Sequence, residues 1–151
     1  MEVLEQTARD WLTEELQFIN RDMAHTLNGR LKAELEDVDE EKQELVLRFP
    51  LEAWQVNGLG TLHGGMVNTM MDLAMSMVIY CFSRQTIPPT VTMTANYLRP
   101  VPMEDWVYIR TRVTSLGRRN ATAYAEAVIP SSGKVACTAI GTYAIIPKQG
   151  A

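Results

Sequence analysis

A single carboxylate, Asp72, interrupts an apolar stretch that runs from residue 64 to residue 81. Burying an ionised carboxylate costs several kcal/mol unless the group is paired, hydrogen-bonded or retained for a purpose. Residues three and four apart share one face of a helix, which places Asp72 in a polar stripe. The stripe consists of Gly65, Asn68, Thr69, Asp72 and Ser76. It must face water, a cavity or another chain, and water chemistry is one use for its carboxylate.

Two consecutive glycines, Gly64 and Gly65, stand where the first turn of this helix is expected. The first turn of a helix leaves backbone N–H groups without intrahelical partners. A glycine also lets a ligand approach the backbone without meeting a Cβ atom. The turn therefore offers a site for a partial negative charge on the same element that carries Asp72.

Length and composition indicate one globular domain spanning residues 1–151, with 46% hydrophobic and 21% charged residues. The first residues lack the continuous apolar run of a signal peptide, so a cytoplasmic protein is expected. Cys81 and Cys137 have no histidines nearby and are expected to be reduced core residues. No metal site is predicted.

The net charge of −4 is unevenly distributed, because residues 1–78 carry 15 acidic and 6 basic residues while residues 79–151 carry 3 and 8. The basic half would suit an anionic ligand, although cations scattered over outward strand faces give the same count. Without a basic run interleaved with aromatics, no nucleic-acid partner is expected. The apolar helix looks too short and too often interrupted to span a membrane, so no membrane partner is expected.

Apolar residues at spacings of three and four predict an amphipathic helix over residues 3–20. It belongs to an N-terminal helical segment, residues 1–28, that the Asn28-Gly29 pair should end. Apolar residues that alternate with polar ones then predict a hairpin of two strands, residues 31–35 and 45–49, joined by an acidic turn.

Four further strands are expected after the apolar helix, at residues 90–102, 106–116, 118–129 and 134–147. One face of the third is alanine, which would let a helix approach the sheet closely. Short connections favour antiparallel pairing, and a sheet curved around the helix would explain why that helix is apolar on most sides. The predicted class is α+β, with six antiparallel strands wrapped round a long central helix and an N-terminal helix.

The order of these elements and one joint motif resemble the PaaI-like group of hotdog-fold acyl-CoA thioesterases over residues 31–146. The motif reads Asn57-x2-Gly60-x2-His63-Gly64-Gly65-x6-Asp72, followed by Tyr97-Leu98-Arg99-Pro100 and Gly117-Arg118-Arg119. The resemblance implies a hotdog fold and hydrolysis of an acyl-CoA to a free acid and CoA. It implies no cofactor, since coenzyme A is part of the substrate.

The resemblance also implies roles for individual residues. The Gly64 N–H would polarise the thioester carbonyl. Asp72, contributed across a dimer interface, would act as nucleophile or general base. Asn57 would orient the thioester or the water, and either Ser76 or Thr90 would hold the water.

The remaining positions of the motif correspond to substrate binding and to the turn. Gly65 belongs to the binding turn, and Arg99, Arg118 and Arg119 would suit the phosphates and adenine of CoA. For His63 the resemblance implies that it positions the turn or contacts the carbonyl, but a histidine that caps the helix would look the same in the sequence. A polar stripe completed by another chain implies a homodimer, often paired again into a homotetramer.

Several alternatives stay open at the level of sequence. Asp72 could pair with an arginine at a subunit interface, and Asn57 could be only a turn residue. A non-catalytic acyl-CoA-binding protein could use the same fold. A hotdog hydratase or dehydratase would need His63 and Asp72 close together, yet they lie about two and a half helical turns apart.

Overall fold

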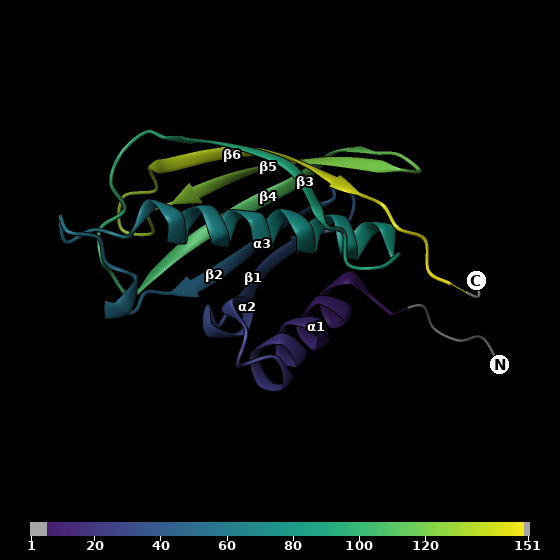
Figure 1. The fold of residues 1–151 in the computed structure, drawn as a ribbon, viewed down its shortest axis with the longest axis horizontal. Coiled ribbons are helices and arrows are strands. Elements are labelled where there is room, and N and C mark those ends of the chain that lie inside the picture. Colours follow the sequence, from purple (N-terminus) through teal and green to yellow (C-terminus); the bar gives the residue numbers. More distant parts are fainter. Residues whose placement is uncertain (1–5, 150–151) are drawn as a thin grey trace.

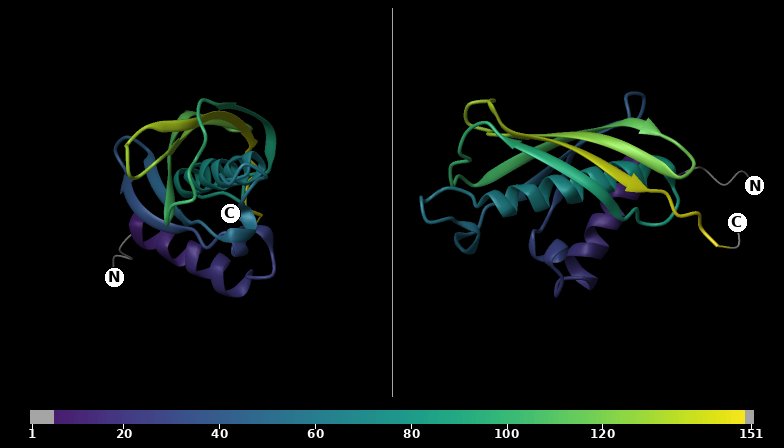
Figure 2. Two further views of the ribbon diagram at one scale, coloured as in Figure 1. Left: turned by 90° about the vertical axis from the view of Figure 1, so that its left-hand side faces the viewer. Right: turned by 45° about the horizontal axis from the view of Figure 1, so that its top comes forward.

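The computed structural model describes residues 6–149, and its centre is the helix α3, Gly64–Ser83. A six-stranded antiparallel sheet with the order β1-β2-β4-β5-β6-β3 lies over this helix (Figure 1). The strands are β1 Glu34–Asp39, β2 Glu44–Pro50, β3 Thr90–Tyr97, β4 Trp106–Leu116, β5 Asn120–Val128 and β6 Val135–Ala144. Seen end-on, the sheet curves around α3 (Figure 2). The predicted α+β hotdog architecture is confirmed.

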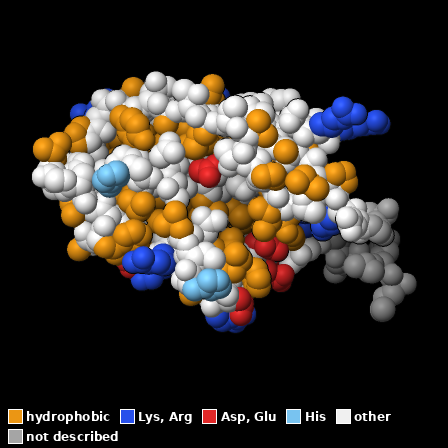
Figure 3. All heavy atoms as spheres, viewed as in Figure 1, with side chains coloured by type: hydrophobic (Ala, Val, Ile, Leu, Met, Phe, Trp, Pro, Cys, Tyr) orange, Lys and Arg blue, Asp and Glu red, His pale blue; other side chains and the backbone are white. Residues whose placement is uncertain are grey.

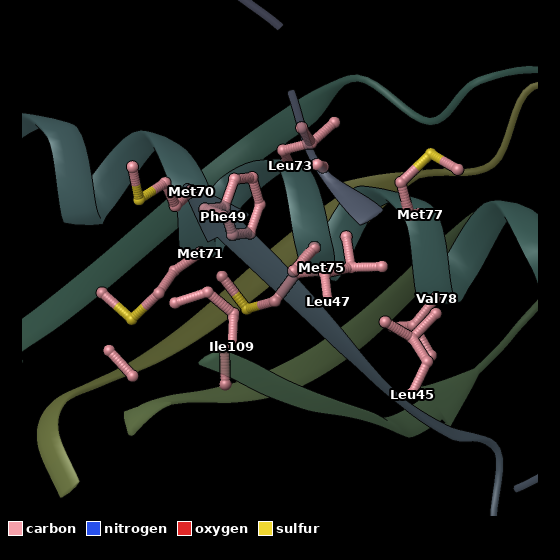
Figure 4. Packing of buried hydrophobic residues seen from close by; sticks show 14 of the residues in the cluster. Leu45, Leu47, Phe49, Met70, Met71, Leu73, Met75, Met77, Val78 and Ile109 are labelled. Atoms are coloured by element: carbon pink, nitrogen blue, oxygen red, sulfur yellow. The ribbon is translucent and has the colours of Figure 1, made fainter. Parts of the chain in front are cut away.

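The core lies between α3 and the concave face of the sheet. Met70, Met71 and Met75 are fully buried, and Leu47 and Ile109 pack in the same cluster (Figure 4). The predicted alanine face is confirmed as well, since the side chains of Ala121, Ala123, Ala125 and Ala127 are all buried. The methionines of α3 are thus core residues, and small alanines give the helix room to approach β5.

By length and composition α3 could cross a membrane, so the expectation that it is too short was wrong. The fold gives the apolar residues another role. More than half of the most apolar part of the helix is buried inside the protein, as in the core helix of a globular domain.

The N-terminal helices differ from the predicted segment 1–28 at both ends. The part before Gln6 lies outside the described residues, and α1 spans Ala8–Asp22, with Thr7 as its N-cap. A second helix, α2 at Leu27–Arg30, includes the Asn28-Gly29 pair that was expected to end helical structure. The reason is local: Thr26 Oγ1 accepts the Gly29 N–H, which starts a new turn. A Cβ at residue 29 would also collide with the Met23 carbonyl, so glycine is needed there.

The first hairpin forms as predicted, but its first strand is displaced. Strand β1 runs from Glu34 to Asp39 rather than over residues 31–35, so acidic residues assigned to the turn belong to the strand. Because β1 is an edge strand, its charged side chains reach solvent, and Glu34 pairs with Arg48 of β2.

The opposite edge of the sheet is β3, which pairs only with β6 among the described strands. Strand β6 is therefore interior, while β4 and β5 form the middle pair. Most of β3 is exposed, and three apolar side chains at this edge, Val91, Tyr97 and Leu98, are more than half accessible. An exposed edge of this kind is a surface on which another strand could pair.

Candidate active site

The polar stripe of α3 lies on its least covered side. Asn68, Thr69, Asp72 and Ser76 are half-buried, whereas the residues between them are mostly buried. The corresponding face of the molecule is largely hydrophobic and uncharged, with lysine and arginine side chains mostly towards its periphery (Figure 3). The predicted stripe is confirmed, and it opens toward the exterior of the subunit.

Asp72 is held by one of its two carboxylate oxygens. Oδ1 accepts hydrogen bonds from Thr90 Oγ1 and from the Tyr143 hydroxyl, both at 2.8 Å. Within residues 6–149 the other oxygen, Oδ2, accepts no hydrogen bond, and no ion pair involves Asp72. The carboxylate is therefore fixed in place without being neutralised, and one oxygen stays available.

Tyr143 is a site residue that the sequence reasoning missed. It is fully buried in β6, and its hydroxyl also lies 3.2 Å from the Asp72 carbonyl oxygen. Burial, followed by the charge of Asp72, raises the pKa of Tyr143 far above its usual value, so the phenol stays protonated. The sequence does contain a signal for it, because inward and outward positions alternate along β6 and position 143 faces inward. A buried phenol there needs a hydrogen-bond partner.

The N-terminus of α3 is capped by His63, whose Nδ1 accepts the Gly65 N–H at 2.8 Å. The capping interpretation of this histidine is thus confirmed, and the Gly65 N–H is engaged. The His63 carbonyl accepts the N–H groups of Met66 and Val67. Among the described residues the Gly64 N–H has no acceptor, so it is the donor that remains for a ligand.

Asn57 builds the loop that precedes this turn. Its Oδ1 accepts the N–H groups of Leu59 and Thr61 at 2.9 and 3.0 Å, and its Nδ2 donates to Thr61 Oγ1 at 2.8 Å. Asn57 therefore stabilises the turn, whether or not it also contacts a substrate. One hydrogen of Nδ2 is left over for another acceptor, because an amide nitrogen carries two.

A cavity of about 380 Å³ lies beside Gly64 and brings together part of the predicted set. Asn57, Gly64 and Arg99 line it, with Tyr97 and the buried Cys137. The Tyr97 hydroxyl donates to the Gly64 carbonyl at 3.0 Å, so β3 fixes this end of the helix.

The other predicted residues do not line this cavity. Thr90 contacts Asp72, whereas Ser76 makes no side-chain hydrogen bond within the described residues. Thr90 is thus the one of the two candidate hydroxyls that touches the carboxylate. Arg118 and Arg119 are exposed between β4 and β5. The Arg119 carbonyl accepts the Ile145 N–H, which places this turn just beyond the C-terminal end of β6.

One subunit thus holds two separate halves of a site. Gly64 and Asp72 are eight residues apart on one helix, which corresponds to about 12 Å along its axis. A reacting carbonyl must lie roughly 3 Å from both an N–H donor and an attacking group, so both residues of one chain cannot serve it. Strand β3 contacts both halves, through Thr90 at one end and Tyr97 at the other.

Comparisons with known proteins identify the family of the chain. Residues 59–136, just over half of the chain, match the family model described as Thioesterase superfamily. The Caenorhabditis elegans protein F42H10.6 is 27% identical over 147 residues, covering 97% of this chain and 87% of the relative. The mouse acyl-coenzyme A thioesterase 13 is 27% identical over 93 residues, covering 62% and 66%.

Solved structures show the same fold. Zebrafish thioesterase superfamily member 2 aligns with a TM-score of 0.77 at 24% identity and covers 89% of this chain and 98% of its own. The PaaI protein of the Escherichia coli phenylacetic acid degradation operon aligns with a TM-score of 0.74 at 20% identity, covering 91% and 94%.

Proposed function

The chain belongs to the thioesterase superfamily, and we propose that it hydrolyses acyl-CoA thioesters to a free acid and coenzyme A. The observation that carries the proposal is the presence on α3 of two groups without a hydrogen-bond partner among residues 6–149, the Gly64 N–H and Oδ2 of Asp72. Hydrolysis of a thioester needs a donor for the oxyanion and a group that attacks or activates water. The relative named acyl-coenzyme A thioesterase 13 supports CoA as the thiol.

A homodimer would bring the two half-sites together. Because β3 is an edge strand, a twofold partner can pair its own β3 antiparallel to it. Antiparallel pairing sets the Thr90 end of one strand opposite the Tyr97 end of the other. Asp72 of one subunit would then face Gly64 of its partner, and two equivalent sites would form. Pairing of two dimers into a homotetramer is a further proposal from the family resemblance.

In this arrangement the thioester oxygen accepts the Gly64 N–H at the positive end of the helix dipole. Oδ2 of Asp72 then either takes a proton from the attacking water or attacks the carbonyl carbon itself. The tetrahedral intermediate collapses, the C–S bond breaks, and the CoA thiolate takes up a proton. In the second route, water hydrolyses the resulting anhydride and restores Asp72.

The substrate contacts are proposals as well. Arg99 lies in the cavity beside Gly64 and suits a CoA phosphate, and the spare Nδ2 hydrogen of Asn57 can reach a carbonyl or water there. Arg118 and Arg119 lie near the Thr90 end of the sheet. In the twofold dimer, the same two arginines of the partner subunit would therefore lie toward the end of β3 that is near Arg99. No cofactor beyond the CoA of the substrate is needed.

The decisive assay is release of free CoA from a panel of aryl and aliphatic acyl-CoAs, followed with a thiol-reactive dye. Burial raises the pKa of both Cys81 and Cys137 to about 11, so the thiols of the folded protein should add little background. The proposal is overturned if no acyl-CoA releases thiol faster than with the Asp72→Ala variant.

The shared site has its own test, complementation between two inactive variants. Asp72→Ala and Gly64→Pro damage different halves, so a heterodimer of the two keeps one intact site. After free exchange of subunits, half of the dimers contain one subunit of each variant. Each mixed dimer has one intact site of two, so about a quarter of wild-type activity should return. If both groups of a site came from one subunit, no mixture would regain activity.

The alternatives from the sequence can be weighed against the geometry. A hydratase needs a histidine beside the carboxylate, but His63 caps the helix about 14 Å from Asp72 along its axis. A binding protein without turnover would retain acyl-CoA in equilibrium dialysis and release no thiol in the dye assay, which separates it from the proposed hydrolase.

A further inference from the structure

Tyr143 donates to the same oxygen of Asp72 as Thr90 does, and the two donors come from paired positions. Thr90 of β3 and Tyr143 of β6 are direct partners in the strand register. Both hydroxyls lie 2.8 Å from Oδ1. Two side chains on neighbouring strands thus form a rigid pair of donors, because the spacing between paired residues is set by the sheet.

The place of the Tyr143 ring depends on a glycine two residues earlier on the same face of β6. A Cβ at Gly141 would lie 2.7 Å from Cε2 of Tyr143 and 3.2 Å from its hydroxyl oxygen. On the helix side the methyl group of Met75 lies 3.2 Å from the same point. Glycine is unfavourable inside a strand and often marks a close approach, which is what it permits here.

We infer that Tyr143, seated against Gly141, is a positioning residue that binds Oδ1 of Asp72 and so leaves Oδ2 as the oxygen that acts in hydrolysis. This inference rests on the proposed thioesterase function. Two donors on one oxygen stop the carboxylate from rotating and occupy that oxygen. Within residues 6–149 the second oxygen accepts no hydrogen bond, so its lone pairs stay available.

The chemistry of the phenol suits this role. Tyr143 is fully buried. Among the described residues, Asp72 is the one charged group that affects the pKa of its phenol, and Thr90 is a neutral neighbour. Its raised pKa keeps the hydroxyl protonated, so Tyr143 donates a hydrogen bond and does not compete with Asp72 as a base.

The test compares Tyr143→Phe with Tyr124→Phe. The first removes the donor and keeps the ring, while the second removes a matched phenol that donates to Glu126 on the outer face of the sheet. Tyr143→Phe should lower kcat by about tenfold with KM within about twofold, since the lost interaction orients a reacting group. Tyr124→Phe should change neither.

A second variant separates positioning from packing. Gly141→Ala should displace the ring and lower kcat in the wild-type background, but it should add little to the loss in kcat once the hydroxyl is gone in Tyr143→Phe. A purely structural role would give additive losses of stability and leave the kcat of the folded protein unchanged. The inference is overturned if the wild-type protein is active and Tyr143→Phe has the same kcat. Wild-type protein that releases no CoA would instead overturn the proposed function and, with it, this inference.

Discussion

Two tyrosines donate hydrogen bonds to carboxylates on opposite faces of the sheet. On the inner face Tyr143 binds Asp72, and on the outer face Tyr124 binds Glu126 at 2.9 Å. The outer carboxylate also pairs with Arg110 at 2.6 Å, whereas no ion pair within the described chain involves Asp72. Both carboxylates thus accept a hydrogen bond from a tyrosine, but only Glu126 also has a cationic partner among the described residues.

The presence of the cation indicates what each carboxylate does. Partial burial would raise the pKa of Glu126, but its hydrogen bonds from Arg110 and Tyr124 and the positive charge of Arg110 hold that pKa below its usual value. Glu126 is therefore a stabilised, fully engaged ion. Asp72 has hydroxyl donors on one oxygen and keeps the other, which is how a carboxylate can be ordered and still react.

The largest expected effect comes from replacing the two carboxylates in turn. Asp72→Asn keeps the shape and an acceptor oxygen but removes the charge, so kcat for the best acyl-CoA should fall by about 10³-fold. Glu126→Gln should leave kcat within about twofold, since its carboxylate is occupied by Arg110. Steady-state kinetics on both variants measure the contrast. Equal losses would show that the two faces do not differ in function.

A smaller effect is expected at the start of α3, where Gly64→Pro removes the free N–H. Proline suits the first helical position, and the extended His63 backbone, with ψ of 133°, suits a residue before proline. Loss of one oxyanion donor should lower kcat by roughly 10²-fold.

Gly64→Ala is the matched control for this variant. It brings a Cβ to the same 3.3 Å from the Tyr97 ring but keeps the N–H. It should therefore retain most of the activity. If alanine and proline are equally damaging, the glycine serves packing against Tyr97 and the N–H plays no part in hydrolysis.

The two candidate hydroxyls can be separated by a further pair of variants. Thr90→Val removes one of two donors on Oδ1 and should lower kcat by about fivefold, a larger loss than for Ser76→Ala. Thr114→Val removes a hydroxyl that bonds Thr122 on the outer face and is the control. A greater loss for Ser76→Ala would assign the water to the hydroxyl one turn along α3.

The sequence predicts most of the framework because period-two and helical patterns are local. The six strands and the buried helix follow from such patterns, as does the polar stripe of Asp72. Where tertiary context decides, prediction fails. Residues 34–39, most of them acidic, form a strand because they lie at a solvated edge. Gly29 lies inside the short helix α2 because Thr26 caps that helix and a glycine fits against the Met23 carbonyl.

The site is less predictable than the fold for the same reason. Motif residues such as Gly64 and Asp72 can be recognised by spacing alone. The contact between Tyr143 and Asp72 joins residues 71 positions apart, and no local pattern specifies it. The sequence also does not reveal that the Asn57 amide oxygen accepts hydrogen bonds within its own loop. Nor does it reveal that, in the part of the chain that the structure describes, Glu126 pairs with an arginine and Asp72 does not.

The smallest expected effect concerns stability, and it should differ in sign between the two carboxylates. Because the pKa of folded Glu126 is lowered, its contribution is present above the unfolded pKa of about 4.3 and is lost as the pH falls through the folded value. Glu126→Gln should therefore lower the free energy of unfolding by about 1 kcal/mol at pH 7 and by less near pH 3. Asp72→Asn removes a half-buried charge that no arginine of its own subunit pairs, so it should leave that free energy unchanged or raise it. Urea unfolding of both variants at the two pH values measures this, and a clear loss of stability in Asp72→Asn would mean that the charge of Asp72 serves the fold.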